Sequence, residues 1–189
     1  MTFSTDQLLN IARQYWPSDL ESYLRPKMGP EGERLQALWK QELAKMEHWR
    51  GFIRALRGEL PGFTLGNATC PFDACFRCSA YSEIDHSPQL DWAVIGCVSI
   101  LAPVYAVYGV RYELKGKQRL SSEVFLESLP DEMRAPSEVI ARKIEETFGA
   151  SAFPRELNEV PVPLFVGLKQ PPNTTLFHAL FTSEPDIVP

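Results

Sequence analysis

The stretch that decides the fold is Trp92–Val110, WAVIGCVSILAPVYAVYGV, in which 19 consecutive positions carry no charged residue. That length is just enough for a transmembrane helix. However, Pro103 lies in the middle of the run, Gly96 and Gly109 interrupt it, and its valines and isoleucines favour extended chain. Basic residues do not flank the run asymmetrically. The sequence therefore predicts two strands joined near Ala102-Pro103 instead of a membrane span.

Outward from this run, the hydrophobic pattern predicts the other strands. Residues 92–101 are almost continuously apolar, which is typical of a central strand buried on both faces. Residues 104–114 alternate between apolar and polar positions, as in a strand with one buried face. Weaker signals predict strands over residues 75–82, 164–169 and 174–182. Adjacent strands with short links favour antiparallel pairing.

Apolar residues at helical spacing predict four helices. They span about residues 5–16, 30–57, 121–129 and 136–148. Ser4 or Thr5 can cap the first helix, and Gly58 with Pro61 can stop the long second one. The third is a short and ambiguous segment that we interpret as a helix, and Gly149 is suited to end the fourth.

The expected order of elements is thus α, α, β, β, β, α, α, β, β. This order corresponds to an α+β fold, with helices packed on an antiparallel sheet of about five strands. Because 189 residues is the length of one ordinary domain, we expect a single α+β domain over residues 1–189. Its helical part would cover about residues 1–60 and its sheet-containing part about residues 66–182.

The composition is that of a globular protein, with 44% hydrophobic and 23% charged residues. The N-terminus lacks a basic segment followed by an apolar stretch, so the sequence does not predict a signal peptide. The four cysteines of an unexported chain are expected to be reduced thiols, and we expect the protein in the cytoplasm, away from membranes.

The net charge of −5 is concentrated at one end of the chain. Residues 121–189 hold 11 acidic and 5 basic residues, whereas the charges nearly balance in residues 1–60 and 61–120. This asymmetry argues against direct nucleic-acid binding and permits a basic protein as partner. A solubilising acidic surface would give the same composition.

The cysteines form the sharpest candidate for chemistry. Cys70-x4-Cys75-x2-Cys78, followed by Cys97, has the spacing of a plant-type two-iron cluster. Bulky intervening residues and the strand position of Cys97 argue against a cluster loop. Zinc bound by Cys70, Cys75 and Cys78 with His86 or Cys97 is the better metal hypothesis. Because Cys75 and Cys78 face opposite ways on a regular strand, structural thiols are favoured, and we expect no cofactor.

Other catalytic signals are weaker. His86 has acids and hydroxyls beside it, but neighbours in sequence do not define a catalytic triad. His48 and His178 have no evident partner, and no serine-hydrolase, zinc-protease or phosphate-loop motif is present. Glu42 falls within the apolar side of the long helix, so its carboxyl should be paired, protonated or at the edge of the buried surface. A salt bridge from the sheet, or a slightly rotated helix, is favoured over a functional carboxylate.

Large aromatic side chains offer an alternative route to recognition. Trp92, Tyr105, Tyr108 and Tyr112 would lie in one region of the sheet, and such residues often anchor protein interfaces. Core packing explains them equally well, and the pattern does not separate the two interpretations.

In size, acidic bias and α+β layout, the chain resembles the immunity proteins of bacterial polymorphic-toxin and type VI effector systems. The resemblance implies a cytoplasmic protein that binds one cognate toxin and blocks its active site. If that toxin is a basic nuclease, the acidic last third complements its substrate groove. The expected contact residues are Glu123, Glu127, Asp131, Glu132, Glu138, Glu145 and Glu146. The alternatives are a cysteine-centred zinc protein or enzyme, and a scaffold or interaction domain.

Overall fold

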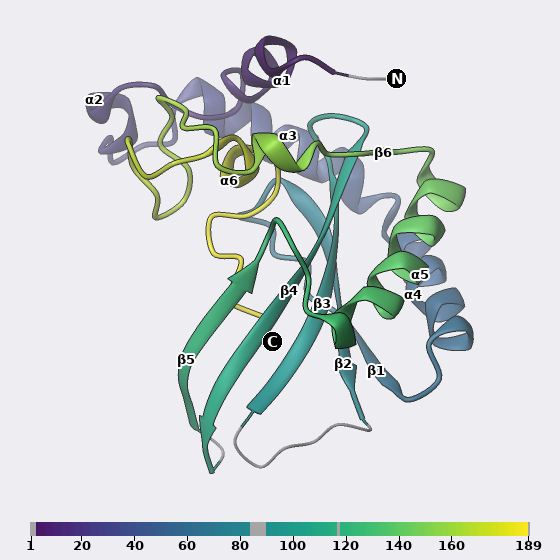
Figure 1. The fold of residues 1–189 in the computed structure, drawn as a ribbon. Helices are drawn as coiled ribbons and strands as arrows, with labels where there is room; N and C mark the ends of the chain where they lie inside the picture. The colour runs from purple at the N-terminus through teal and green to yellow at the C-terminus, as the bar shows by residue number, and fades with distance from the viewer. Residues whose placement is uncertain (1–2, 84–89, 117, 189) are drawn as a thin grey trace.

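We describe a computed structural model of the chain that covers residues 3–83, 90–116 and 118–188. It has the predicted α+β class, with helices packed on an antiparallel sheet in the order β1-β2-β3-β4-β5 (Figure 1). A short sixth strand pairs with β4 in parallel. The strands are β1 (Phe63–Asn67), β2 (Cys75–Ser82), β3 (Leu90–Ser99), β4 (Val104–Lys115), β5 (Gln118–Phe125) and β6 (Ser151–Ala152).

The uncharged run forms a pair of strands, as predicted. Strands β3 and β4 are antiparallel, and their register places Val98 opposite Tyr105 and Ile95 opposite Tyr108. Among the residues that the structure describes, no helix is both long enough and apolar enough to cross a membrane. The proline and glycines that argued against a helix in this run thus lie within a strand pair and its connection.

Six α-helices and a 3-10 turn complete the described chain. They are α1 (Thr5–Ala12), α2 (Leu20–Tyr23), α3 (Pro30–Leu43), α4 (Met46–Glu59), α5 (Asp131–Phe148), η1 (Arg155–Leu157) and α6 (Leu176–Leu180). The prediction of one long helix over residues 30–57 was wrong, because the helix breaks between α3 and α4. Neither proline nor glycine marks the break. With the break, Trp39 of α3 and Trp49 of α4 both pack against the ring of Phe76 in β2.

The C-terminal third contains the largest errors of prediction. The segment expected as a short helix over residues 121–129 is mostly strand β5, because it pairs along β4. The strand expected over residues 174–182 contains helix α6, which begins with a capping box between Thr175 and His178. Residues 164–169 form only an isolated bridge, between Val166 and Lys169.

One correctly predicted helix has a shifted boundary, and one strand was not predicted. Helix α5 begins at Asp131, five residues before the predicted start, and carries Pro136 inside it. It ends at Gly149, as expected, in the left-handed conformation that glycine adopts most readily. An additional edge strand, β1, pairs with β2.

The two faces of the sheet are covered differently. Helices α4 and α5 lie on one side, and α5 packs so closely that a Cβ on Gly96 would come within 2.6 Å of Ile140 (Figure 1). The other face is covered by the C-terminal segment, which we define as residues 176–188. There the hydroxyls of Tyr108 and Tyr112 each donate a 3.1 Å hydrogen bond to a backbone carbonyl of this segment.

Candidate functional site

The cysteines lie on both faces of the sheet, as strand alternation required. Cys75 shares a face of β2 with Arg77, which is opposite Cys97, whereas Cys78 packs beneath α5 against Gly96. Burial raises the pKa of the Cys78 thiol to about 12 and that of Cys75 well above its usual value. These thiols are therefore protonated, and they act as small apolar side chains.

The predicted metal ligands do not converge in the described part of the chain. Cys70 is only partly buried and precedes β2, away from the strand positions of the other three cysteines. Within residues 3–83, 90–116 and 118–188, no group of three or more His, Cys, Asp or Glu side chains could hold a metal ion. His86, the alternative zinc ligand, lies outside the described residues together with its acidic neighbours.

The two described histidines have structural contacts. His178 accepts a 3.0 Å hydrogen bond from the backbone N–H of Thr175 through Nδ1, which completes the cap of α6. Burial, with a smaller contribution from Lys169, lowers the pKa of His178 to about 4. The ring of His48 packs against that of Phe148, at 5.0 Å between centroids. His178 is thus neutral at pH 7 and occupied in a cap.

Glu42 is ion-paired, which was one of its predicted interpretations. Its partner is Lys45, with 2.7 Å between Nζ and the carboxylate oxygen. The cation comes from the next turn of the chain and not from the sheet. Glu42 is therefore part of the junction between α3 and α4.

The aromatic residues considered for recognition belong to the core. Tyr108 and Tyr112 are each only 1% exposed. Trp92 packs edge-on against Phe63, and Tyr105 donates a 2.6 Å hydrogen bond from its hydroxyl to Glu145. Their large side chains thus serve packing and internal hydrogen bonding.

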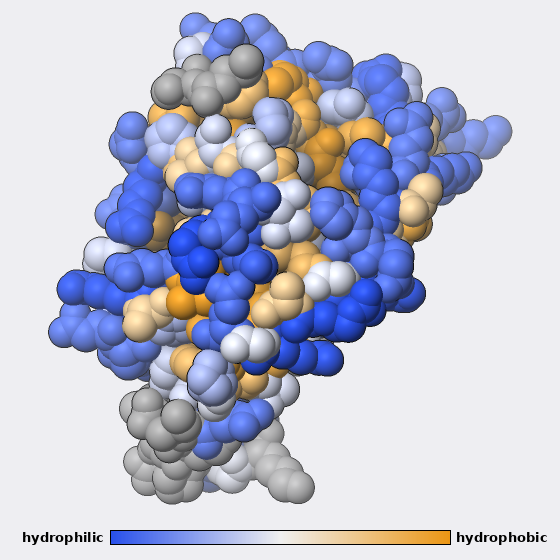
Figure 2. All heavy atoms as spheres, turned by 90° about the vertical axis from the view of Figure 1, so that its right-hand side faces the viewer, coloured by the Kyte–Doolittle hydropathy of each residue, from blue (hydrophilic) through white to orange (hydrophobic). Residues whose placement is uncertain are grey.

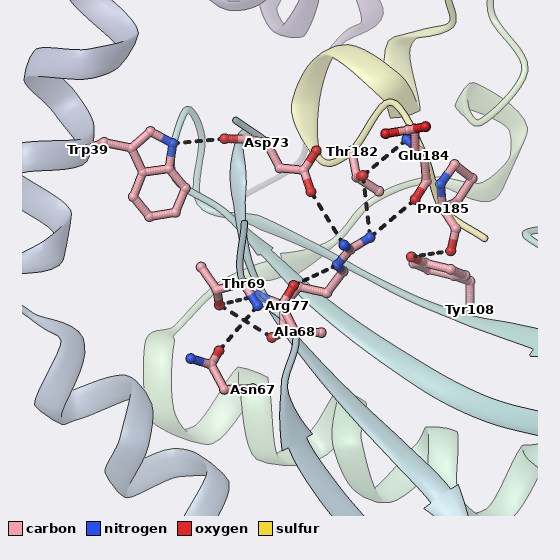
Figure 3. Close-up of polar contacts among 10 residues, drawn as sticks. All are labelled: Trp39, Asn67, Ala68, Thr69, Asp73, Arg77, Tyr108, Thr182, Glu184 and Pro185. Carbon is pink, nitrogen blue, oxygen red and sulfur yellow. Dashed lines mark hydrogen bonds and ion pairs between the residues drawn. The ribbon is translucent and has the colours of Figure 1, made fainter. Parts of the chain in front are cut away.

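A buried arginine that the sequence analysis did not single out organises one face of the sheet. Arg77 is 4% exposed, and Figure 3 shows its guanidinium surrounded by oxygens from three parts of the chain. It donates to the carbonyl of Ala68 (3.0 Å) and the carbonyl of Glu184 (3.3 Å), and lies 3.6 Å from the Asp73 carboxylate. The sequence signal that could have identified it is a charged residue among the otherwise uncharged positions of CFRCSA, residues 75–80.

This arginine network is a structural joint. Burial raises the pKa of the Asp73 carboxyl even though Arg77 lies beside it. The guanidinium also donates to the Thr182 hydroxyl at 3.4 Å, so it ties β2 to the C-terminal segment. Its donors are used within the fold, and we assign it no part in binding.

The seven predicted acidic contact residues are all exposed, on β5, the β5–α5 connection and α5. Most of them interact within the molecule. Their partners are Arg111 for Glu123 and Glu132, Arg134 for Asp131, Tyr105 for Glu145, and Arg142 with Lys143 for Glu146. The ion pairs among these contacts neutralise part of the negative charge of residues 121–189.

Glu127 and Glu138 differ from the other five. In the described chain their carboxylates form no hydrogen bond or ion pair, although the backbone carbonyl of Glu127 accepts a 2.9 Å bond from Arg155. Glu156 and Glu159, which the sequence analysis did not select, are likewise exposed and unpaired among the described residues. Glu138 lines one hollow of the surface, and the other three are next in the chain to residues that line it.

We call this hollow the α5 groove. Its volume is about 150 Å³, and it lies between β4, α5, the β5–α5 connection and the segment around η1. It is lined by Tyr105, Ala106, Val107, Tyr108, Leu126, Leu129, Ser137, Glu138, Ala141, Ala152, Phe153, Arg155, Asn158 and Phe177. The lining is mostly apolar, with Glu138, Arg155 and Asn158 as its charged and amide groups.

The groove exists because the edge of β4 is incompletely covered. Strand β5 begins its pairing with β4 at Gly109, and β6 pairs only with Val104 and Tyr105. The residues between them line the groove. Figure 2 shows that the side of the molecule carrying α4 and α5 is mainly hydrophilic, with smaller hydrophobic areas exposed between polar side chains.

No family model, curated protein or solved structure matches this chain. Its function is therefore argued from its own side chains. Among the described residues, the buried thiols are protonated, His178 caps α6, and Arg77 has its hydrogen bonds within the fold. The surface around α5, by contrast, is acidic and partly apolar. This surface is suited to binding another macromolecule.

Proposed function

We propose that this protein is an immunity protein, which binds a cognate bacterial toxin through the surface around α5 and covers the active site of that toxin. The observation that carries the proposal is the α5 groove, a hollow whose lining combines apolar side chains with the unpaired carboxylate of Glu138, while the unpaired Glu127 follows the lining residue Leu126 in the chain. Apolar hollows with a charged rim are typical of protein interfaces.

The charge of the surface favours a basic partner. Carboxylates without internal partners keep their full charge for an incoming protein, whereas those already paired with arginines change less on binding. A nuclease, whose substrate groove is basic, would complement this surface and lose access to nucleic acid when covered. Charge attraction of this kind accelerates association and weakens with added salt.

Two steps test the proposal. The tagged protein is first used to capture a stoichiometric partner from its native host, which is identified by mass spectrometry. The captured protein is then expressed alone and together with wild-type chain. Toxicity alone, and growth restored by co-expression, is the expected result, with an association rate that falls as salt is raised.

A charge-reversal pair locates the interface. Glu127→Lys together with Glu138→Lys should slow association on the order of tenfold or more, since two attractive charges become repulsive. The matched control is Glu21→Lys, an exposed acid on α2 at the other end of the chain, which should leave the rate within about twofold.

Three outcomes would count against the proposal. A partner that is not toxic would favour the scaffold alternative, and a captured small molecule would favour an enzyme or carrier. Neutralisation that survives the Glu127 and Glu138 reversals unchanged would place the interface elsewhere on the molecule.

A further inference from the structure

The uncovered edge of β4 adds backbone hydrogen-bonding groups to the α5 groove, beside its apolar and acidic side chains. We propose that the groove is a recognition pocket for one arginine side chain of the protein partner. The inference rests on the proposed function for the identity of the partner, and on the groove itself for the choice of arginine.

The backbone of Val107 lacks a strand partner on one edge of β4. The carbonyl of Tyr105 accepts a 2.8 Å bond from the Phe153 N–H, so it points to the outer edge of β4. Since orientation alternates along a strand, the N–H and C=O of Val107 point to the same edge. No backbone partner lies beside them in the described chain, because β6 ends and β5 begins on either side. Val107 itself lines the groove.

Asn158 lines the same groove and is only 4% exposed. Its amide nitrogen donates a 3.0 Å hydrogen bond to the Leu126 carbonyl, which orients the side chain. Among the described residues its Oδ1 accepts no hydrogen bond. A mostly buried acceptor left open at a cavity wall favours a ligand that donates.

The groove also contains charged groups. The carboxylate of Glu138 lines the groove, and Glu127, Glu156 and Glu159 add three more carboxylates nearby in the chain. Arg155 is the cation among the described lining residues, and its Nη1 is held by the carbonyl of Glu127. Arg142, which follows the lining residue Ala141, is already paired with Glu59 and Glu146. The unpaired carboxylate of Glu138 is therefore the lining group that favours a cationic ligand.

Together these groups match a guanidinium better than an ammonium. The groove presents three kinds of acceptor: the Val107 carbonyl, the Asn158 Oδ1 and the Glu138 carboxylate. A guanidinium carries five N–H donors in a planar array, whereas an ammonium carries three on a point charge. The aliphatic stem of an arginine would lie against apolar lining residues such as Leu129 and Ala141.

The direct test needs no partner protein. Isotope-labelled full-length chain is titrated with N-acetyl-arginine methylamide and followed by two-dimensional NMR. Millimolar binding is expected, with the largest shifts at the backbone amide of Val107 and the side-chain amide of Asn158. The blocked amides of lysine, norleucine and glutamate are titrated in parallel, and lysine should bind more weakly than arginine.

Two matched pairs of variants show where the ligand sits. Ala141→Phe fills the groove and should abolish the shifts, while Ala135→Phe, at an exposed position of the same helix, should not. Glu138→Gln should weaken binding on the order of fivefold, as expected for the loss of one partly exposed charge contact, and Glu146→Gln should change it by less than about twofold. The spectrum of each variant reports whether it is folded.

The inference is overturned if arginine produces no shifts at Val107 and Asn158, or if Ala141→Phe leaves them unchanged. Equal shifts with norleucine would make the groove an apolar pocket, and stronger binding of glutamate would assign it to Arg155 and an anion. These results are independent of partner capture. A partner neutralised through the surface around α5 without an arginine in the groove would leave the proposed function standing, while the arginine pocket would be excluded.

Discussion

The two faces of the sheet are stabilised by different means. On the face under α5, close packing dominates: Gly96 and Gly109 leave no room for a side chain, because Ile140 and Met133 occupy that space. On the opposite face, side chains of β2 and β4 donate hydrogen bonds to backbone carbonyls of the C-terminal segment. The first face depends on shape, and the second on satisfied polar groups.

This difference predicts how each face responds to substitution. A face built on shape tolerates loss of polarity but not added volume. A face built on polar contacts tolerates small changes of volume but not the loss of a buried partner. The following experiments test that contrast, in order of decreasing expected effect.

The largest effect is expected on the polar face, for Arg77→Met. Removing the guanidinium leaves the Asp73 carboxylate buried without its cation, which costs about 3–5 kcal/mol of unfolding free energy. Urea denaturation at pH 7 measures this loss. Adding Asp73→Asn to the variant should recover part of it, because the uncompensated charge is removed.

The matched control is Arg50→Met, at an exposed arginine of α4, which should stay within about 0.5 kcal/mol of wild type. An equal loss for both arginine variants would mean that the Arg77 network does not stabilise the fold, and the contrast between the faces would fail.

The next effect concerns the packed face. Gly96→Ala brings a methyl group within 2.6 Å of Ile140 Cγ2, a branch fixed close to its backbone, and should cost about 1–3 kcal/mol. Gly109→Ala brings its methyl group against the Met133 Sδ instead. Because an unbranched methionine can adapt, this variant should lose clearly less stability.

Thermal unfolding of the two glycine variants separates them. If Gly109→Ala is destabilised as much as Gly96→Ala, then the flexibility of the opposing side chain does not decide the cost, and the description of this face as a rigid fit needs revision.

A smaller effect is expected for the tyrosines of the polar face. Tyr108→Phe and Tyr112→Phe keep the rings and remove one hydrogen bond each to the C-terminal segment, at about 1 kcal/mol apiece. Tyr15→Phe is the control, since the described chain shows no hydrogen bond to its hydroxyl. Similar stability for all three variants in urea would contradict a role of the two hydroxyls.

The smallest effect at neutral pH is expected for His178→Gln, since glutamine at this position retains the capping box with Thr175. The difference emerges in acid. The unfolded histidine gains a proton below about pH 6.5, whereas the folded one does so only near its pKa of about 4. The stability that His178 contributes is therefore present above pH 6.5 and lost as the pH falls towards 4.

Urea midpoints at pH 7.5 and pH 4.5 test this directly. Wild type should lose more stability between the two pH values than His178→Gln. Parallel behaviour of the two proteins would show that the histidine is as accessible to protons in the folded chain as in the unfolded one.

The elements that the sequence predicted well are those whose pattern has one structural solution. A continuous apolar run with a central proline reads as two buried strands, and residues 92–101 and 104–114 proved to be β3 and β4 within a few residues. Residues 121–129 have no such pattern, and their pairing with β4 made most of them a strand. Similarly, the Thr175 and His178 cap made a helix of a segment that reads as extended.

The sequence predicted the acidic composition of the candidate site, but it did not predict the position of the site on the surface. Counting charges identified the acidic last third, and all seven selected acids are exposed. The charge count could not show that Arg111 pairs with Glu123 and Glu132, because these three residues meet only when β4, β5 and α5 pack together. Nor could the charge count single out Glu127 and Glu138 as the two of these seven acids that are unpaired in the described chain.

By itself, the sequence determined the α+β class, the central strand pair and the acidic bias of residues 121–189, because hydrophobic period and net charge are local properties. Only the tertiary structure decided how far β5 and β6 extend along β4. That extent leaves Val107 open, creates the α5 groove, and depends on distant segments competing for one strand edge. The physical reason is that a backbone hydrogen bond between strands joins residues far apart in the chain, and no local pattern records its absence.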